Sequence, residues 1–269
     1  MKRELNAKNL IFSVTLGLAS ALAVYVFFKI FSSYNYPTFF YHPVKEEEKA
    51  LAKYIGKAGF FTYFTYLALG LSGLWGVGRT ICYLSGFKKG LKFFDNEYVV
   101  IFVTLNEVIT LVAYCVPQYF AAVPFGFTGW AWKNLKGFFQ SLFMHVIFPI
   151  CVITFFALFK PEKEVKTKKV CLLSSFALLY AVIVKVLGRF VFPVEWYPYP
   201  VFSAEGVWLA VFKNLDDFNY ASGVFGVIIC AVLLIALYAL SLLLLAKITN
   251  KKYFRSIVKG DDKTDKTRL

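Results

Sequence analysis

Six apolar blocks, each about 20 residues long, constrain this chain more than any other feature of its sequence. Each block must be a helix, because lipid offers no hydrogen-bond partner to an exposed backbone N–H or C=O group. At 1.5 Å per residue, about 20 residues cross a hydrocarbon core of about 30 Å. The sequence therefore predicts an all-α, polytopic, multi-pass membrane protein with six transmembrane helices, at approximately 10–31, 59–83, 98–122, 138–159, 169–192 and 221–246.

The composition excludes an ordinary soluble protein. Hydrophobic residues make up 59% of the chain and aromatic residues 20%, which is outside the range of a soluble globular domain. We expect one six-helix domain over residues 1–249 and a charged, disordered cytoplasmic tail over residues 250–269. The first block follows basic residues, as in a signal peptide, but its length and the lack of a small-residue cleavage site favour a retained helix.

The basic residues predict the orientation of the helices. Lysine and arginine concentrate in the N-terminus, in segments 84–97 and 160–168 and at the C-terminus, and they are sparse in the opposite loops. Basic segments remain in the cytoplasm, so both termini are expected there. This distribution accounts for the net charge of +14, and we expect no nucleic-acid partner. The excess of lysine over arginine fits a low-GC bacterium, and hence a bacterial cell membrane.

No motif predicts a cofactor or a metal. The chain has no glycine-rich phosphate loop and no cluster of cysteine and histidine residues. The five cysteines are widely spaced and form no C-x-x-C pair, so they are interpreted as small buried apolar residues. They are Cys82, Cys115, Cys151, Cys171 and Cys230.

Ionisable residues inside a membrane are costly, and they are candidates for function. Three basic residues near helix ends, Lys29, Arg79 and Arg189, are expected to extend their charged groups towards the headgroups. Three others remain, and they are Glu107, His145 and Lys185.

Thr65 and His145 occupy matched positions in the second and fourth blocks. Each lies about 10 Å below the outer boundary. Lys185 is about as far from the outer end of the fifth block, so these three side chains are expected to share one layer. Glu107, beside Asn106, is expected about one turn deeper than His145, near the bilayer midplane.

This set of residues can support nucleophilic catalysis. A threonine hydroxyl becomes a good nucleophile when a base removes its proton, and neutral imidazole suits that role. His145 is the candidate base for Thr65, and Ser141, one turn earlier, is a candidate hydrogen-bond partner of the imidazole. Lys185 is a candidate for stabilising an oxyanion or holding an anionic group of an amphiphile.

Purely structural roles account for the same residues. Threonine in a membrane helix commonly bonds the carbonyl three or four residues back. His145 can link neighbouring helices, and Glu107 and Lys185 can form an interhelical ion pair. Thr62 and Thr104 are rival hydroxyls.

Three ordered motifs resemble those of a bacterial family of six-helix membrane proteins. The elements are Tyr63-Phe64-Thr65, the His-x-x-x-Pro element from His145 to Pro149, and a Trp-Tyr-Pro-Tyr-Pro element that includes Trp196, Tyr197 and Tyr199. That family is similar to the eukaryotic androgen-induced threonine hydrolases, which cleave fatty acid esters of hydroxy fatty acids. The resemblance implies that Thr65 is the nucleophile and His145 its base.

Three functions are therefore predicted. The first is an intramembrane threonine hydrolase that cleaves a fatty-acyl ester of an amphiphilic lipid near the outer leaflet, with Tyr197 and Tyr199 bordering the mouth of the site. The second is a small transporter that uses Glu107, His145 and Lys185. The third is a lipid-binding protein without catalysis. Each has membrane lipids as its partners.

Overall fold

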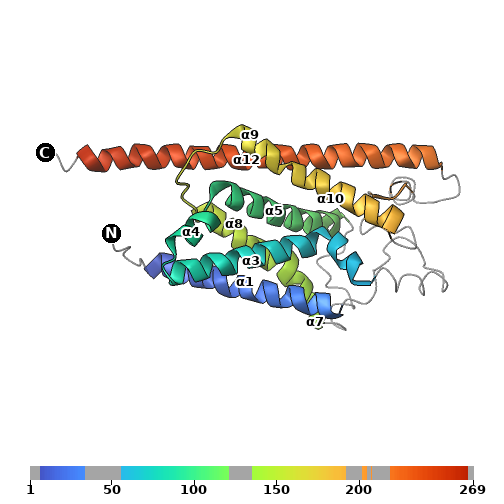
Figure 1. The fold of residues 1–269 in the computed structure, drawn as a ribbon, viewed down its shortest axis with the longest axis horizontal. Coiled ribbons are helices and arrows are strands. Elements are labelled where there is room, and N and C mark those ends of the chain that lie inside the picture. The colour runs from blue at the N-terminus through green and yellow to red at the C-terminus, as the bar shows by residue number, and fades with distance from the viewer. Residues whose placement is uncertain are drawn as a thin grey trace. The chain divides into compact units, whose positions relative to one another are not determined.

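The computed structural model describes residues 7–33, 56–120, 135–191, 202–204, 207 and 219–265, and all regular structure in these ranges is helical (Figure 1). The all-α prediction is therefore confirmed. The longer helices are α1 (Ala7–Ser33), α3 (Phe64–Leu84), α5 (Glu97–Phe120), α8 (Phe148–Leu158), α10 (Ser175–Val186) and α12 (Tyr220–Asp265). The shorter elements are η1 (Gly56–Thr62), α4 (Lys88–Phe94), α7 (Leu135–Leu142), η2 (Phe143–Ile147), α9 (Thr167–Leu173) and η3 (Leu187–Val191).

The helices match the predicted spans. Within the described residues, five stretches are long and apolar enough to cross a membrane, and they are Leu10–Ser33, Phe64–Leu84, Phe138–Leu158, Thr167–Val191 and Tyr220–Arg255. A sixth span results if α4 and α5, which are bent by 47°, count as one. Large apolar side chains such as Leu18, Leu74 and Leu240 are exposed on these helices, as expected where lipid covers the surface. The chain is thus a polytopic membrane protein, while its orientation stays a prediction.

The chain divides into two compact units, where the sequence predicts a single domain. The first unit comprises Met1–Lys29, Thr65–Val170 and Leu243–Leu269, and the second comprises Ile30–Phe64 and Cys171–Leu242. Both candidate catalytic residues belong to the first unit.

Glycines on α3 bring α1 and α3 into close antiparallel contact (Figure 1). A Cβ atom added at Gly73 would lie 3.0 Å from a methyl group of Val24 and 3.3 Å from the carbonyl oxygen of Ser20. One turn further along, Gly76 faces the Ser20 side chain. Small residues let transmembrane helices approach in this way.

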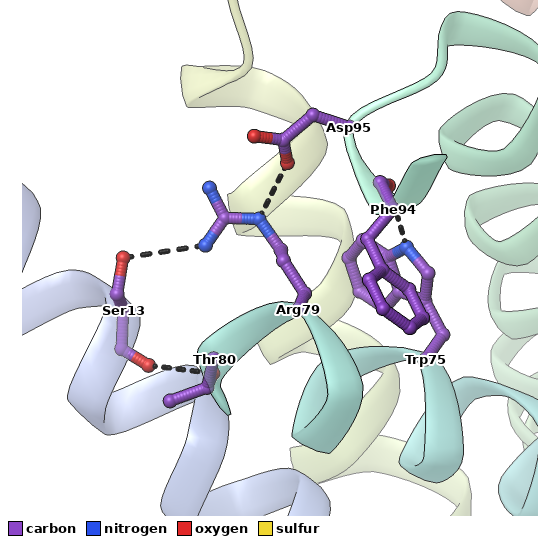
Figure 2. A network of polar contacts seen from close by, with 6 residues as sticks. All are labelled: Ser13, Trp75, Arg79, Thr80, Phe94 and Asp95. Atoms are coloured by element: carbon purple, nitrogen blue, oxygen red, sulfur yellow. Dashed lines mark hydrogen bonds and ion pairs between the residues drawn. The ribbon is translucent and has the colours of Figure 1, made fainter. Parts of the chain in front are cut away.

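Arg79 forms a buried polar network at the end of the first unit that carries the α3–α4 turn (Figure 2). Its Nε donates a 2.6 Å hydrogen bond to Asp95, and its Nη1 donates to the hydroxyl of Ser13 at 3.2 Å. The guanidinium also lies 4.5 Å from the centre of the Phe155 ring. The residue is only 9% exposed. The expectation that Arg79 extends towards the headgroups is wrong, because Asp95 supplies its counter-charge inside the protein.

Removing either member of the Arg79–Asp95 pair is expected to leave a poorly compensated charge. Arg79→Met should lower the free energy of unfolding by about 2–3 kcal/mol, and Asp95→Asn by somewhat more, because it leaves the more deeply buried charge, that of Arg79, without its partner. The double variant should lose less than the sum of the two. Denaturant titration in detergent micelles measures all three values, and strict additivity would contradict a direct interaction.

The C-terminal helix extends beyond its predicted end. Helix α12 continues to Asp265, where the sequence predicts a disordered tail from residue 250. Asn250 exchanges two hydrogen bonds with the backbone of Val165, at 2.7 and 3.1 Å. Lys252 donates a 2.6 Å hydrogen bond to the carbonyl of Phe156 near the end of α8. These contacts hold the charged start of the predicted tail in the helix.

In the second unit, Tyr180 on α10 contacts several other segments. Its hydroxyl donates a 2.6 Å hydrogen bond to the carbonyl oxygen of Thr62. Its ring packs edge-on against Phe64 and Phe202. Together these contacts join η1, α10 and the segment at residues 202–204.

Candidate functional site

His145 lies in a single wide turn of π-helix, η2, between α7 and α8. Pro149 follows four residues later and has no backbone N–H, so the α-helical hydrogen bond to the His145 carbonyl cannot form. The wide turn accommodates this missing bond, and such turns are frequent at functional sites. The His-x-x-x-Pro element therefore has a local structural consequence.

The imidazole of His145 is anchored through one ring nitrogen. Nδ1 lies 2.8 Å from the backbone oxygen of Ser141 and 3.3 Å from the Ser141 hydroxyl. A carbonyl oxygen only accepts hydrogen bonds, so Nδ1 carries the proton in the neutral ring. Nε2 is then the basic nitrogen. The structure thus brings together Ser141 and His145, as the sequence suggests, and the backbone carbonyl is the closer partner.

Thr65 lies near the start of α3 and is half-buried. It is one turn from Leu69 and two turns from Ser72, both of which are buried, so it belongs to the inward face of α3. Trp75 on α3 packs against Phe155 on α8, with 5.2 Å between ring centroids. Thr65 precedes Trp75 by the same number of residues as His145 precedes Phe155.

Thr65 and His145 are therefore at a similar depth. Helices α3 and α8 both run antiparallel to α5, because the start of α5 lies near the ends of both. Asp95, just before α5, bonds Arg79 near the end of α3. Glu97, at the start of α5, accepts hydrogen bonds from the N–H groups of Glu162 and Lys163, just after α8. No hydrogen bond joins Thr65 to His145 among the described residues. The structure places the two groups in one layer without connecting them.

Glu107 is the most deeply buried acid in the described part of the chain. Its side chain on α5 is 0% exposed, and neither carboxylate oxygen has a hydrogen-bond partner among the described residues. The Ser72 hydroxyl faces this carboxyl group from α3, outside the geometry of a standard hydrogen bond. Because Ser72 lies two turns beyond Thr65, Glu107 is about 10 Å deeper than Thr65, further than the single turn predicted.

The other predicted residues either have contacts of their own or lie outside the described part of the chain. Asn106 donates from Nδ2 to the carbonyl of Phe102 in its own helix, at 3.0 Å. Lys185 belongs to the second unit, where its Nζ donates a 2.9 Å hydrogen bond to the carbonyl of Phe202. Its predicted place in the layer of Thr65 and His145 stays a prediction. Trp196, Tyr197 and Tyr199 lie outside the described residues.

The rival hydroxyls have different surroundings. Thr62 is fully buried in the second unit, and its Oγ1 donates a 2.6 Å hydrogen bond to the Gly59 carbonyl. Thr104 is buried one turn before Glu107, without a hydrogen-bond partner among the described residues. Neither hydroxyl forms a hydrogen bond with a described histidine.

Sequence reasoning missed two hydroxyls of the Glu107 region, Ser72 and Thr110. Thr104, Glu107 and Thr110 follow each other at three-residue intervals, a spacing that puts neighbours on adjoining turns of a helix. This spacing could have been recognised in the sequence. The position of Ser72 near Glu107 could not, because it depends on how α3 packs against α5. The oxygens of this region suit a hard cation better than a transition metal.

Comparison with models of known protein families, with curated proteins and with solved structures finds no match for this chain. The resemblance to the six-helix threonine hydrolases therefore stays a prediction based on the three motifs.

Proposed function

We propose that this protein is an intramembrane hydrolase with a threonine nucleophile, acting on a fatty-acyl ester of an amphiphilic lipid. The observation that carries the proposal is the hydrogen bond from His145 Nδ1 to the Ser141 carbonyl, which leaves Nε2 as a base at the depth of Thr65. In hydrolases with a nucleophile and a histidine base, a group bonded to the other ring nitrogen orients the imidazole in the same way.

The proposed reaction has two steps. In the first, Thr65 Oγ attacks the ester carbonyl while Nε2 of His145 takes the hydroxyl proton. The C–O bond to the alcohol then breaks, the alcohol leaves with that proton, and an acyl-threonine ester remains. In the second step, His145 takes a proton from water, the resulting hydroxide attacks the acyl group, and the fatty acid departs as Thr65 recovers its proton.

The proposal requires Thr65 and His145 to come into hydrogen-bond contact when the substrate binds. Catalytic hydrogen bonds are often long before substrate is bound and shorten in the complex. The wide turn at His145 and the position of Thr65 at the start of α3 place both groups at helix irregularities, where small side-chain and backbone adjustments are least costly.

We further infer a bacterial cell membrane location with both termini in the cytoplasm, from the distribution of lysine and arginine. In this orientation Thr65 and His145 lie in the outer leaflet, where a lipid ester can enter laterally between helices.

Labelling of the purified protein with a lipophilic fluorophosphonate tests the nucleophile. Wild type and Thr65→Ser are expected to react, because both keep a hydroxyl beside the base. Thr65→Ala should lose labelling almost completely, whereas Thr62→Ala, which removes the rival hydroxyl, should keep it. Equal labelling of wild type and Thr65→Ala, with both proteins folded in a thermal unfolding assay, would exclude Thr65 as the nucleophile.

The transporter prediction relied on Glu107, His145 and Lys185 acting together. Glu107 is expected about two turns deeper than Thr65, and Lys185 belongs to the second unit. The transporter therefore stays a prediction, and the surroundings of Glu107 are the part of it that the described residues characterise.

A further inference from the structure

Four buried residues of the first unit, on two helices, carry side-chain oxygen atoms without hydrogen-bond partners. Glu107 lies between Thr104 and Thr110 on α5, and Ser72 on α3 faces its carboxyl group. Each of the four is at most 2% exposed. Their five side-chain oxygens, two from Glu107 and one from each hydroxyl, have no hydrogen-bond partner among the described residues.

This arrangement is unfavourable without a ligand. Buried polar groups in folded proteins are nearly always hydrogen-bonded, and a charged group in a membrane interior requires a partner. Some other buried polar groups of the same unit follow that rule, while the Ser20 hydroxyl on α1 also lacks a partner among the described residues. Glu97, for example, accepts hydrogen bonds from the N–H groups of Glu162 and Lys163 at 2.9 and 2.8 Å. Glu107 thus differs from the other buried glutamate of its helix, Glu97.

The chemistry of the four side chains identifies the ligand class. Carboxylate and hydroxyl oxygens are ligands of hard cations, which they contact at about 2.3–2.6 Å.

The charge of the site selects a monovalent ion. Glu107 is the acidic residue of this cluster, and one carboxylate neutralises one positive charge. Sites for divalent cations such as Ca²⁺ usually supply several carboxylates. We propose that Ser72, Thr104, Glu107 and Thr110 form a binding site for a monovalent cation of the Na⁺ class, which links α3 to α5 within the membrane.

The proposal is independent of ester hydrolysis, because the site lies about two turns from Thr65. Its consequence is a cation-dependent stability, since a ligand that binds only the folded protein raises the midpoint of unfolding. The unfolding midpoint is measured in detergent micelles in NaCl and in choline chloride at equal concentration. At ten times the dissociation constant, wild type should gain roughly 3 °C in NaCl.

Variants assign the effect to the site. Glu107→Gln removes the charge and keeps the shape, so the response to Na⁺ should disappear. Ser72→Ala should shift the half-effective concentration at least about tenfold. Glu97→Gln is the matched control, because it alters another buried glutamate and should leave the response unchanged. If Glu107→Gln fails to fold, Ser72→Ala and binding of ²²Na⁺ to wild type decide the question.

Three results would overturn the proposal. They are an unfolding midpoint of wild type that is equal in the two salts, an Na⁺ response that survives in Glu107→Gln, and stabilisation by acid alone. The last would mean that Glu107 holds a proton in place of a cation.

Discussion

His145→Ala is expected to lower the kcat of lipid-ester hydrolysis by about 10³-fold, with little change in KM. General-base catalysis by a positioned side chain contributes about 10²–10⁴-fold, and the lost interaction exists only in the transition state. The substrate for the assay is a fluorogenic long-chain ester in mixed micelles. A variant that keeps more than a tenth of the wild-type kcat would exclude His145 as the base.

Pro149→Ala tests the geometry of the same site and keeps its chemistry. Alanine restores a backbone N–H four residues after His145, so η2 is expected to relax towards an ordinary α-helical turn. The imidazole would then move relative to Thr65, and a displacement of about 1 Å can cost about 100-fold in rate. The kcat should fall by about 10–100-fold while the protein remains folded.

The control for Pro149→Ala is Ile150→Ala, at the next position on α8. Ile150 is exposed on the helix surface, so its truncation should leave kcat within about twofold of wild type. Equal rates for Pro149→Ala and wild type would show that the wide turn has no part in positioning the base.

The sequence predicts the helices well because their signal is local. A run of apolar residues requires a helix in lipid wherever the chain leads next. The depth of Thr65 and His145 follows in the same way, by counting residues from the ends of two helices. The bend between α4 and α5 could not be predicted in this way. Helix α4 carries Lys88, Lys89 and Lys92, and because of these charges the sequence does not show that α4 continues into the apolar span that follows.

Contacts between distant segments could not be predicted. Arg79 and Asp95 are 16 residues apart, and their ion pair depends on the turn after α3, where Gly86 has a φ of +71°. The sequence does not reveal this turn, so an arginine near a helix end is expected to reach the headgroups. The contacts of Asn250 and Lys252 could not be predicted either, because Val165 lies in the loop between α8 and α9 and Phe156 lies near the end of α8.

Gly76→Ala is expected to destabilise the first unit by about 2 kcal/mol, the largest effect of any single added methyl group on α3. Its Cβ would collide with the Ser20 hydroxyl and lie 2.8 Å from the Ser20 Cβ. Ser20 lies on α1 with 0% exposure, so the side chain has little room to move, and overpacking of this kind costs about 1–3 kcal/mol. The apparent free energy of unfolding is measured by denaturant titration in micelles.

Ser20→Gly provides the compensating change. With the Ser20 side chain removed, the next described neighbour of the added methyl group is Leu16, at 3.8 Å, which is an ordinary contact distance. Glycine inside α1 costs about 1 kcal/mol by itself, so the double variant must be compared with both single variants. The cycle should show a favourable coupling of about 1–2 kcal/mol. Leu74→Ala, on the exposed face of α3, is the control and should change stability little. Additive effects in the Gly76–Ser20 cycle would mean that α1 and α3 are not held together at this point, and the close packing of these helices would lose its main support.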